Sequence, residues 1–191
     1  MSNSAQNRLG LYLAVIAALL VVQALALLAM GHPLICTCGY VAVWHGNPSG
    51  PETSQHLTDW YTYTHVIHGL LFYLGLWLIA PRMPFIVRLA LALGLEVTWE
   101  IIENTPLIME RYRQSALARG YFGDSVVNSL FDTLATAVGF ILARVLPIWS
   151  SVAVVIGIEI FLGVMIRDNF TLNVIQLIYP NEALSLWQSG G

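Results

Sequence analysis

Apolar residues gather in five long runs, separated by shorter polar stretches. The runs cover residues 9–30, 60–80, 85–105, 122–146 and 148–166. Each run is long enough to cross a hydrocarbon core of roughly 30 Å as a helix. Prolines fall between several runs, at Pro81, Pro84, Pro106 and Pro147, where they end or start helices. The pattern predicts an all-α, multi-pass transmembrane helical bundle of about five spans, formed by a single domain over residues 1–191.

The two ends of the chain give further expectations. The first run, residues 9–30, is longer than the apolar core of roughly 7–15 residues in a signal peptide, so we expect an uncleaved helix. Residues 167–191 alternate apolar and polar side chains and include Trp187. This pattern is typical of a segment that lies at the membrane interface.

Composition supports a membrane protein and argues against nucleic acid as a partner. The 191 residues are 57% hydrophobic and only 10% charged, with a formal net charge of −3. Nucleic-acid binding needs a concentrated basic patch, and the chain has no lysine. The arginine-free loop of residues 31–59 favours a cytoplasmic N-terminus, although the arginines divide equally between the two sides.

Ionisable and polar side chains occupy the same end of four runs. They are His65, His68, Glu96, Glu100, Glu103, Asp124, Asn128, Asp132 and Glu159. Consecutive spans alternate in direction, and spacings of three, four and seven residues place the side chains of each run on one helix face. Gly139 continues the face of Asp132 and would allow close helix packing. Because a charge in a bilayer is costly unless it has a partner, the pattern predicts a polar pocket within one leaflet.

The pocket residues allow three kinds of role. As a metal centre for Zn, Mn or Mg, it would use His65, His68, Glu96, Glu100, Glu103 and Asp124 as ligands. Without a metal, His65 or His68 would act as a general base, oriented by Glu100 or Asp132. A hydrogen-bond network that only locks the helices together is the structural alternative. Together these readings make His65, His68, Glu100 and Asp132 the candidate catalytic residues.

The loop between the third and fourth runs carries Arg111, Arg113 and Arg119 near the predicted pocket mouth. Guanidinium groups suit phosphate, and lipid headgroups lie at this depth, so these arginines and Asn128 are candidate substrate-binding residues. Ordinary solvated loop charge is the alternative for each arginine.

The first loop contains Cys36 and Cys38, with His32 and His45 nearby in sequence. These four residues are a possible zinc site, although the Cys-x-Cys spacing is unusual. A disulfide between the two cysteines is the other possibility. The apolar character of residues 33–44 predicts a re-entrant or interfacial loop over the pocket.

Several strings carry a family resemblance: GHPLICTCG at 31–39, HVIHGLLFY at 65–73, WEIIEN at 99–104, GDSVVNSLFDTL at 123–134 and RDNFTLN at 167–173. With them, the chain resembles a family of uncharacterised bacterial inner-membrane proteins of unknown function. The second to fourth runs also look distantly like VanZ-like proteins, which pair an early His with a Glu and an Asp-x3-Asn-x2-Gly pattern. Here Thr136 replaces the Asn of that pattern. The resemblance implies a setting in the bacterial cell envelope and names no substrate.

These observations predict a cell-envelope protein that uses the pocket as a metal-assisted enzyme on a lipid-linked or phosphate-bearing substrate. An ion- or proton-binding transporter or accessory subunit is a second hypothesis. A non-catalytic membrane assembly factor is a third. The apolar inner halves of the spans weigh against a transport path, because they offer no second polar access route.

Overall fold

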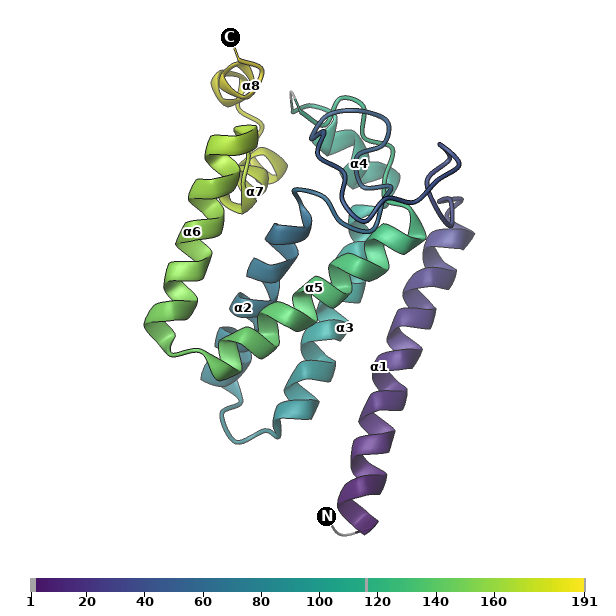
Figure 1. Cartoon of the computed structure of the whole chain (residues 1–191), viewed down its shortest axis with the longest axis vertical. Coiled ribbons are helices and arrows are strands. Elements are labelled where there is room, and N and C mark those ends of the chain that lie inside the picture. The colour runs from purple at the N-terminus through teal and green to yellow at the C-terminus, as the bar shows by residue number, and fades with distance from the viewer. Residues whose placement is uncertain (1–2, 116, 191) are drawn as a thin grey trace.

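The computed structural model describes residues 3–115 and 117–190, and this part of the chain is all-α (Figure 1). Its eight helices are α1 (Asn3–Ala29), α2 (Thr62–Ile79), α3 (Phe85–Glu103), α4 (Pro106–Tyr112), α5 (Val126–Val145), α6 (Ile148–Ile166), α7 (Phe170–Ile178) and α8 (Glu182–Gln188). Within the described residues, β-structure is limited to one isolated bridge between Trp44 and Thr58. The all-α part of the predicted fold class is therefore confirmed.

Four helices are long and apolar enough to cross a membrane. They cover Leu9–Ala29, Thr62–Ile79, Val126–Val145 and Ile148–Ile166. The remaining predicted span, residues 85–105, forms helix α3, whose 19 residues are similar in number to those of α2, α5 and α6. It differs because it carries Arg88, Glu96, Glu100 and Glu103 in 19 residues. The boundaries of α2, α3, α5 and α6 agree with the predicted runs to within four residues, whereas α1 begins at Asn3, six residues before the predicted start.

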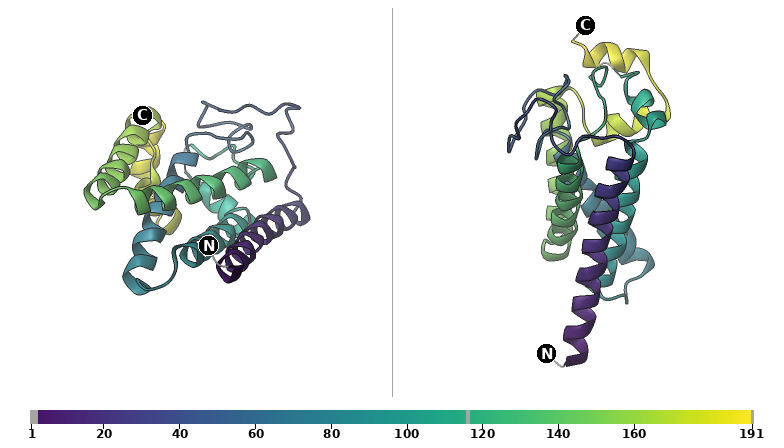
Figure 2. Two further views of the ribbon diagram at one scale, coloured as in Figure 1. Left: turned by 60° about the horizontal axis from the view of Figure 1, so that its bottom comes forward. Right: turned by 90° about the vertical axis from the view of Figure 1, so that its right-hand side faces the viewer.

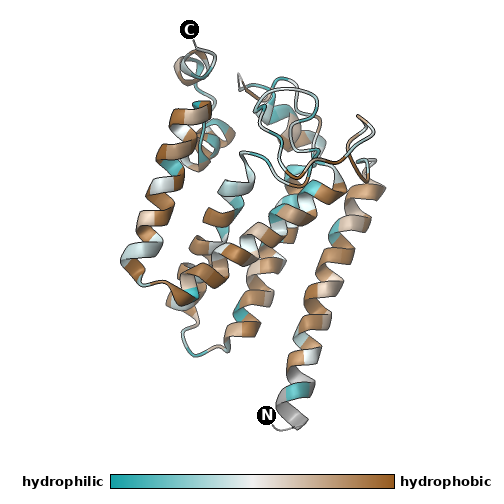
Figure 3. Ribbon diagram, in the orientation of Figure 1, coloured by the Kyte–Doolittle hydropathy of each residue, from teal (hydrophilic) through white to brown (hydrophobic). Residues whose placement is uncertain are grey.

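The connections place all the longer loops at one end of the bundle. The N-terminus lies at the opposite end, whereas the loop before α2, helix α4 and the C-terminal helices α7 and α8 share the loop end (Figures 1 and 2). Figure 3 shows hydrophilic residues gathered at this end, while α1 and α6 are mainly hydrophobic. The structure thus has one polar end, as the sequence pattern predicts.

The crossing of α2 and α5 depends on two glycines. A Cβ atom on Gly69 would lie 2.1 Å from the carbonyl oxygen of Thr136, and one on Gly139 would lie 2.1 Å from the carbonyl oxygen of Val66. Such contacts are too short for any other residue type. The predicted packing role of Gly139 is therefore confirmed. The close approach also lets the Thr136 hydroxyl donate to the carbonyl of His65, at 3.0 Å, which fixes His65 opposite α5.

The other end of the bundle is filled by apolar packing. Leu76, Leu89, Ala92, Leu93 and Phe140 form one buried cluster there. Arg88 is also buried at this end, with its guanidinium 5.3 Å from the centre of the Tyr73 ring. This packing separates the polar end from the end of the bundle that holds the N-terminus.

Candidate functional site

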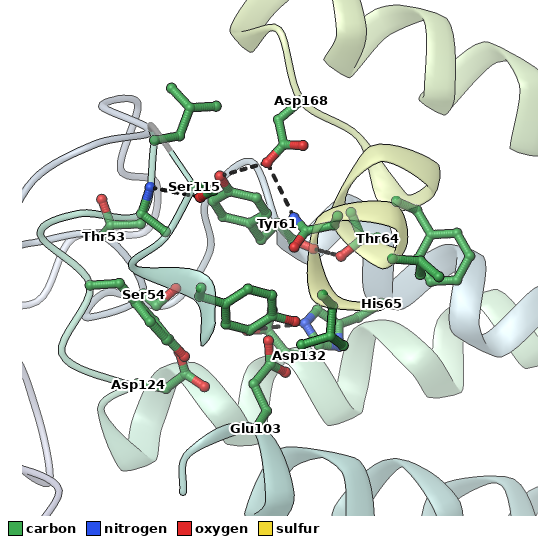
Figure 4. A pocket seen from close by; sticks show the side chains of 18 of the residues that line it. Thr53, Ser54, Tyr61, Thr64, His65, Glu103, Ser115, Asp124, Asp132 and Asp168 are labelled. Atoms are coloured by element: carbon green, nitrogen blue, oxygen red, sulfur yellow. Dashed lines mark hydrogen bonds and ion pairs between the residues drawn. The ribbon is translucent and has the colours of Figure 1, made fainter. Parts of the chain in front are cut away.

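A cavity of about 400 Å³ opens at the polar end of the bundle (Figure 4). Its walls come from α2, α3, α5 and α7, from the end of α4, from the connection between α6 and α7, and from the two loops that precede α2 and α5. His65, Glu103, Asp124, Asp132 and Asp168 all line it, and Figure 4 shows their side chains around a common space. The cavity therefore brings together four residues that were predicted to share a pocket, together with Asp168, which was not predicted.

His65 lies at the centre of the buried carboxylates. Its Nδ1 atom is 2.5 Å from Oε1 of Glu96 and 3.3 Å from Oε1 of Glu100. On the other side of the ring, Nε2 lies 3.9 Å from Oδ2 of Asp132. All four residues are less than a tenth exposed. One imidazole thus contacts acids from two other helices.

His68 lies one helical turn further along α2 and shares Glu96 with His65. Its Nδ1 atom is 3.0 Å from Oε2 of Glu96. The ring is packed edge-on against Trp99 and Phe170, with centroid distances of 6.3 and 5.3 Å. Nε2 of His68 has no hydrogen-bond partner among the described residues, and His68 lines the cavity. When Nδ1 donates to Glu96, Nε2 is the ring nitrogen that can accept a proton.

Glu100 is also tied to α1 and α5 by a buried relay. The Ser129 hydroxyl donates to Oε2 of Glu100 at 2.6 Å. The side-chain amide of Gln23 donates to the same hydroxyl at 2.7 Å, and Thr133 donates to Oε1 of Gln23 at 2.9 Å. This part of the network has the helix-locking role of the structural alternative. Sequence reasoning missed it, because Gln23 was a single polar residue in an apolar run.

Two buried carboxylate oxygens remain without a hydrogen-bond partner in the described part of the chain. They are Oε1 of Glu100 and Oδ1 of Asp132. Oε1 of Glu100 is near His65, but Nδ1 of that ring already faces Glu96 at shorter range. A buried carboxylate oxygen without a partner is costly, so a proton or a bound cation is needed there.

The histidines and acids also satisfy a simple geometric test for a metal site. One ligand atom each from His65, His68 and Glu96 lie within 4.8 Å of one another, and the same holds for His65, Glu100 and Glu103. Imidazole nitrogen with carboxylate oxygen is a ligand set for Zn or Mn. These two groups contain five of the six residues predicted as metal ligands.

Asp124, the sixth predicted ligand, is engaged elsewhere. Its Oδ2 accepts from the Asn104 amide at 2.6 Å, and its Oδ1 accepts from the Tyr121 hydroxyl at 2.9 Å. Burial raises the pKa of Asp124, against the effect of these two hydrogen bonds. Asp124 lines the cavity but lies outside both candidate metal groups.

Asp168 is a site residue to which sequence reasoning gave no role. It lies between α6 and α7, where its Oδ2 accepts from the Tyr61 hydroxyl at 3.2 Å and its Oδ1 accepts from the Gln188 amide at 3.1 Å. Burial raises the pKa of Asp168 to about 7. The side chain joins both C-terminal helices to the start of α2. Only its place in the string RDNFTLN hinted at this, because no helical periodicity connects it to the other acids.

The candidate substrate-binding arginines are held by other parts of the protein. Nε of Arg111 donates to the Leu177 carbonyl at 2.8 Å, and Nε of Arg113 donates to the Tyr121 carbonyl at 2.7 Å. Arg119 is exposed. The cavity lining contains no arginine within the described residues. The structure therefore does not bring these side chains to the cavity.

Asn128 and Glu159 also hold the fold together at the polar end. The Asn128 amide donates to the His56 carbonyl at 2.9 Å, which fastens the first loop to α5. Glu159 accepts from the backbone N–H groups of Phe170 and Thr171, at 2.9 and 3.2 Å. Its carboxylate therefore holds the start of α7 against α6. Neither side chain lines the cavity.

The first loop contains a disulfide between Cys36 and Cys38. The predicted zinc set does not assemble around it, because both ring nitrogens of His32 face backbone carbonyls, of Asp124 at 3.1 Å and of Asn104 at 3.0 Å. Glu52 and His56 lie beside the sulfur atoms in place of His32 and His45. The loop does line the cavity, through residues 48–54 and not through the apolar stretch 33–44.

The fold and the site together define a class: an all-α bacterial protein with several candidate membrane helices and a buried His/Glu cluster beside a one-ended cavity. The candidate spans indicate contact with a lipid bilayer. The chain belongs to the DUF2585 family, described as a protein of unknown function, which matches residues 27–190.

Relatives of similar length share about half of the residues. A UPF0314 protein of Paracoccus denitrificans is 52% identical over 170 residues, which cover 89% of this chain and 88% of the relative. UPF0314 proteins of Rhizobium meliloti and Sphingopyxis alaskensis are 47% and 48% identical, over 97% and 93% of this chain and 94% of each relative. No solved structure matches the chain. The predicted membership of an uncharacterised bacterial family is confirmed, and the distant likeness to VanZ-like proteins stays a prediction.

Proposed function

We propose that this protein is an enzyme of the bacterial inner membrane whose cavity faces the periplasm. In this arrangement α3 is a fifth span, because its acids face His65 and its Arg88 packs on Tyr73, so its charges need not meet lipid. The N-terminus would be cytoplasmic. The Cys36–Cys38 disulfide at the cavity end supports this orientation, since disulfides persist in the oxidising periplasm and are rare in the cytosol.

The proposed chemistry is acid–base catalysis by the histidines and acids of the cavity. His68 is the general base, because it lines the cavity and Glu96 holds its Nδ1, which leaves Nε2 without a partner among the described residues. Asp132 and Glu100 lie on either side of His65 and would hold or accept a proton during the reaction. The observation that carries the proposal is the pair of buried oxygens without a partner, Oε1 of Glu100 and Oδ1 of Asp132, beside His65.

We further propose that a divalent cation such as Zn, Mn or Mg binds at His65, Glu100 and Glu103. Their ligand atoms are close together, and the open oxygen of Glu100 would gain a partner. A cation in this position would polarise a substrate oxygen or lower the pKa of a bound water. It leaves His68 free to act as the base.

The proposed substrate is linked to a lipid. The cavity lies beside the proposed spans, and its apolar wall includes Leu71 and Phe72 of α2 and Trp99 of α3. Such a wall suits an acyl or prenyl chain. Recognition of a phosphate-bearing substrate would depend on the cation, because Arg111 and Arg113 are held by main-chain carbonyls.

A transporter is the less favoured reading. A transport path needs access from both sides, and beyond the cavity the described bundle is closed by the crossing at Gly69 and Gly139 and by the apolar cluster around Phe140. An enzyme needs only the one opening.

Metal analysis of the purified protein tests the cation. We expect about one divalent ion per chain in the wild type and in Glu110→Gln, a control that changes an exposed carboxylate. We expect His65→Ala and Glu100→Gln to lose it. Equal, near-zero metal in all four proteins would remove the cation and leave acid–base catalysis alone.

A further inference from the structure

The charge of the cavity lining is strongly one-sided. Glu103, Asp124, Asp132 and Asp168 line the cavity, and Glu96 and Glu100 lie directly behind His65. Against these six acids stand the imidazoles of His65 and His68, and the described lining contains no lysine or arginine. The described part of the lining therefore offers several carboxyl groups to a positive group, and it offers an anion no guanidinium or ammonium group.

Aromatic rings form much of the remaining lining. Tyr61, Tyr112 and Tyr121 lie on the loop side, and Phe72, Trp99 and Phe170 lie on the membrane side. The faces of aromatic rings attract cations, and acids combined with aromatic rings are the usual surroundings of an organic ammonium group in a protein. A phosphate or sulfate would find neither a guanidinium group nor an ammonium group in this lining.

On one side, the cavity is lined by exposed apolar side chains that would face lipid in the proposed orientation. Leu71 of α2 and Ile178 of α7 line it and are 41% and 73% exposed. Leu71 lies about 14 Å along α2 from its first residue, at the level of acyl chains in the proposed orientation. A ligand with a polar head between the acids and an apolar tail that extends past Leu71 would match both the acidic and the apolar parts of the lining.

We infer that the cavity binds an amphiphile with a cationic head, an amine or quaternary ammonium group carried on an alkyl chain. This inference rests on the proposed function, whose substrate class it specifies. The open Oδ1 of Asp132 is the principal partner of the ammonium group, and Asp168 adds attraction at the outer end. The rings of Trp99 and Phe170 cover the start of the tail.

Three probes with the same chain test the inference: dodecyltrimethylammonium, dodecyl phosphate and dodecanol. Each is titrated by calorimetry into the full-length protein in dodecyl maltoside micelles, with protein-free micelles as the blank. We expect the ammonium probe to bind at least roughly tenfold more tightly than the phosphate probe, because a charge-assisted contact in a buried site is worth about that factor. Dodecanol should lie between them.

Matched variants separate specific binding from detergent exchange. We expect Asp132→Asn to weaken binding of the ammonium probe roughly tenfold, and Asp168→Asn to weaken it roughly threefold. Glu110→Gln should leave the affinity for this probe unchanged. Circular dichroism checks that each variant is folded. Equal binding of all three probes, tighter binding of the phosphate probe, or affinity unaffected by both Asp variants would overturn the inference. Metal content is measured without these probes. A failure here with metal still bound would therefore reject the cationic head and keep the proposed enzyme.

Discussion

Glu96 holds His68 by a 3.0 Å contact between Oε2 and Nδ1, while its other oxygen faces His65. One fully buried carboxylate therefore orients both imidazoles of the site. The arrangement resembles a general base with its orienting acid, since Nε2 of His68 has no hydrogen-bond partner among the described residues. Loss of Glu96 should therefore disturb both histidines of the site at once.

Loss of Glu96 should destabilise the protein more than loss of His68. Glu96→Ala removes the partner of two buried imidazoles, and breaking a buried ionic cluster costs roughly 3 kcal/mol or more. The His68 side chain is 14% exposed and borders the cavity, so water can replace its contact in His68→Ala. Thermal unfolding in maltoside micelles measures both. Equal unfolding midpoints for the two variants would show that Glu96 does not organise the cluster.

The α2–α5 crossing should not tolerate a side chain. Gly139→Ala forces a Cβ against the Val66 carbonyl, and overpacking of this kind costs about 1–3 kcal/mol. Gly157→Ala is the matched control, because a Cβ at Gly157 meets nothing within 4 Å. We expect a lower unfolding midpoint for the first variant and an unchanged or slightly higher one for the second. A neutral Gly139→Ala would mean that the two helices do not approach this closely.

Asp168 should make the docking of the C-terminal helices sensitive to pH. Burial raises its pKa in the folded state to about 7, above the ordinary value of 3.8. Between those two values the folded protein holds a proton that the unfolded chain does not, so this group's stabilising contribution falls as pH rises from about 4 to about 7. Asp168→Asn keeps a carbonyl acceptor for Tyr61 and should flatten this slope.

The unfolding midpoint of both proteins, measured from pH 5 to pH 8, checks this. The pKa values of Asp59 and Asp124 are also raised by burial, so some slope should remain in the variant. Identical slopes for wild type and Asp168→Asn would contradict the assignment to Asp168.

The first loop should be reachable from outside the cell. Cys38 is exposed and its disulfide partner Cys36 is buried. After mild reduction of intact cells in which only the outer membrane has been opened, a membrane-impermeant maleimide should label wild type and should not label the Cys36→Ser/Cys38→Ser double variant. Labelling that requires rupture of the inner membrane would reverse the proposed orientation.

Much of the fold followed from the sequence, because it depends on local patterns. Run length and proline positions predicted helices α1, α2, α3, α5 and α6, and the spacing of acids and histidines predicted that His65, Glu100 and Asp132 would meet. The roles of Asn128 and Glu159 did not follow. Both lie on the expected helices, but their partners are backbone groups of a loop and of a helix start. Helical periodicity does not determine the path that a loop takes.

The contacts of the arginines could not be predicted from helical periodicity either. Their position at the mouth was predicted from span direction, but Arg111 reaches the last carbonyls of α7. That contact depends on how the C-terminal segment folds back, which an alternating pattern of residues 167–191 does not specify. The acidic and aromatic character of the cavity became visible only when Tyr61, Tyr121 and Asp168 were placed beside Asp132.

Lipid analysis of a deletion strain tests the central claim most directly, namely that the cavity is an active site and not only a structural network. Lipid extracts are compared by mass spectrometry after complementation with wild type, His68→Gln or Glu110→Gln, with equal membrane levels of each protein. We predict that one lipid-linked species accumulates in the deletion and His68→Gln strains and returns to normal with wild type and Glu110→Gln. Full complementation by a correctly inserted His68→Gln protein would contradict the account.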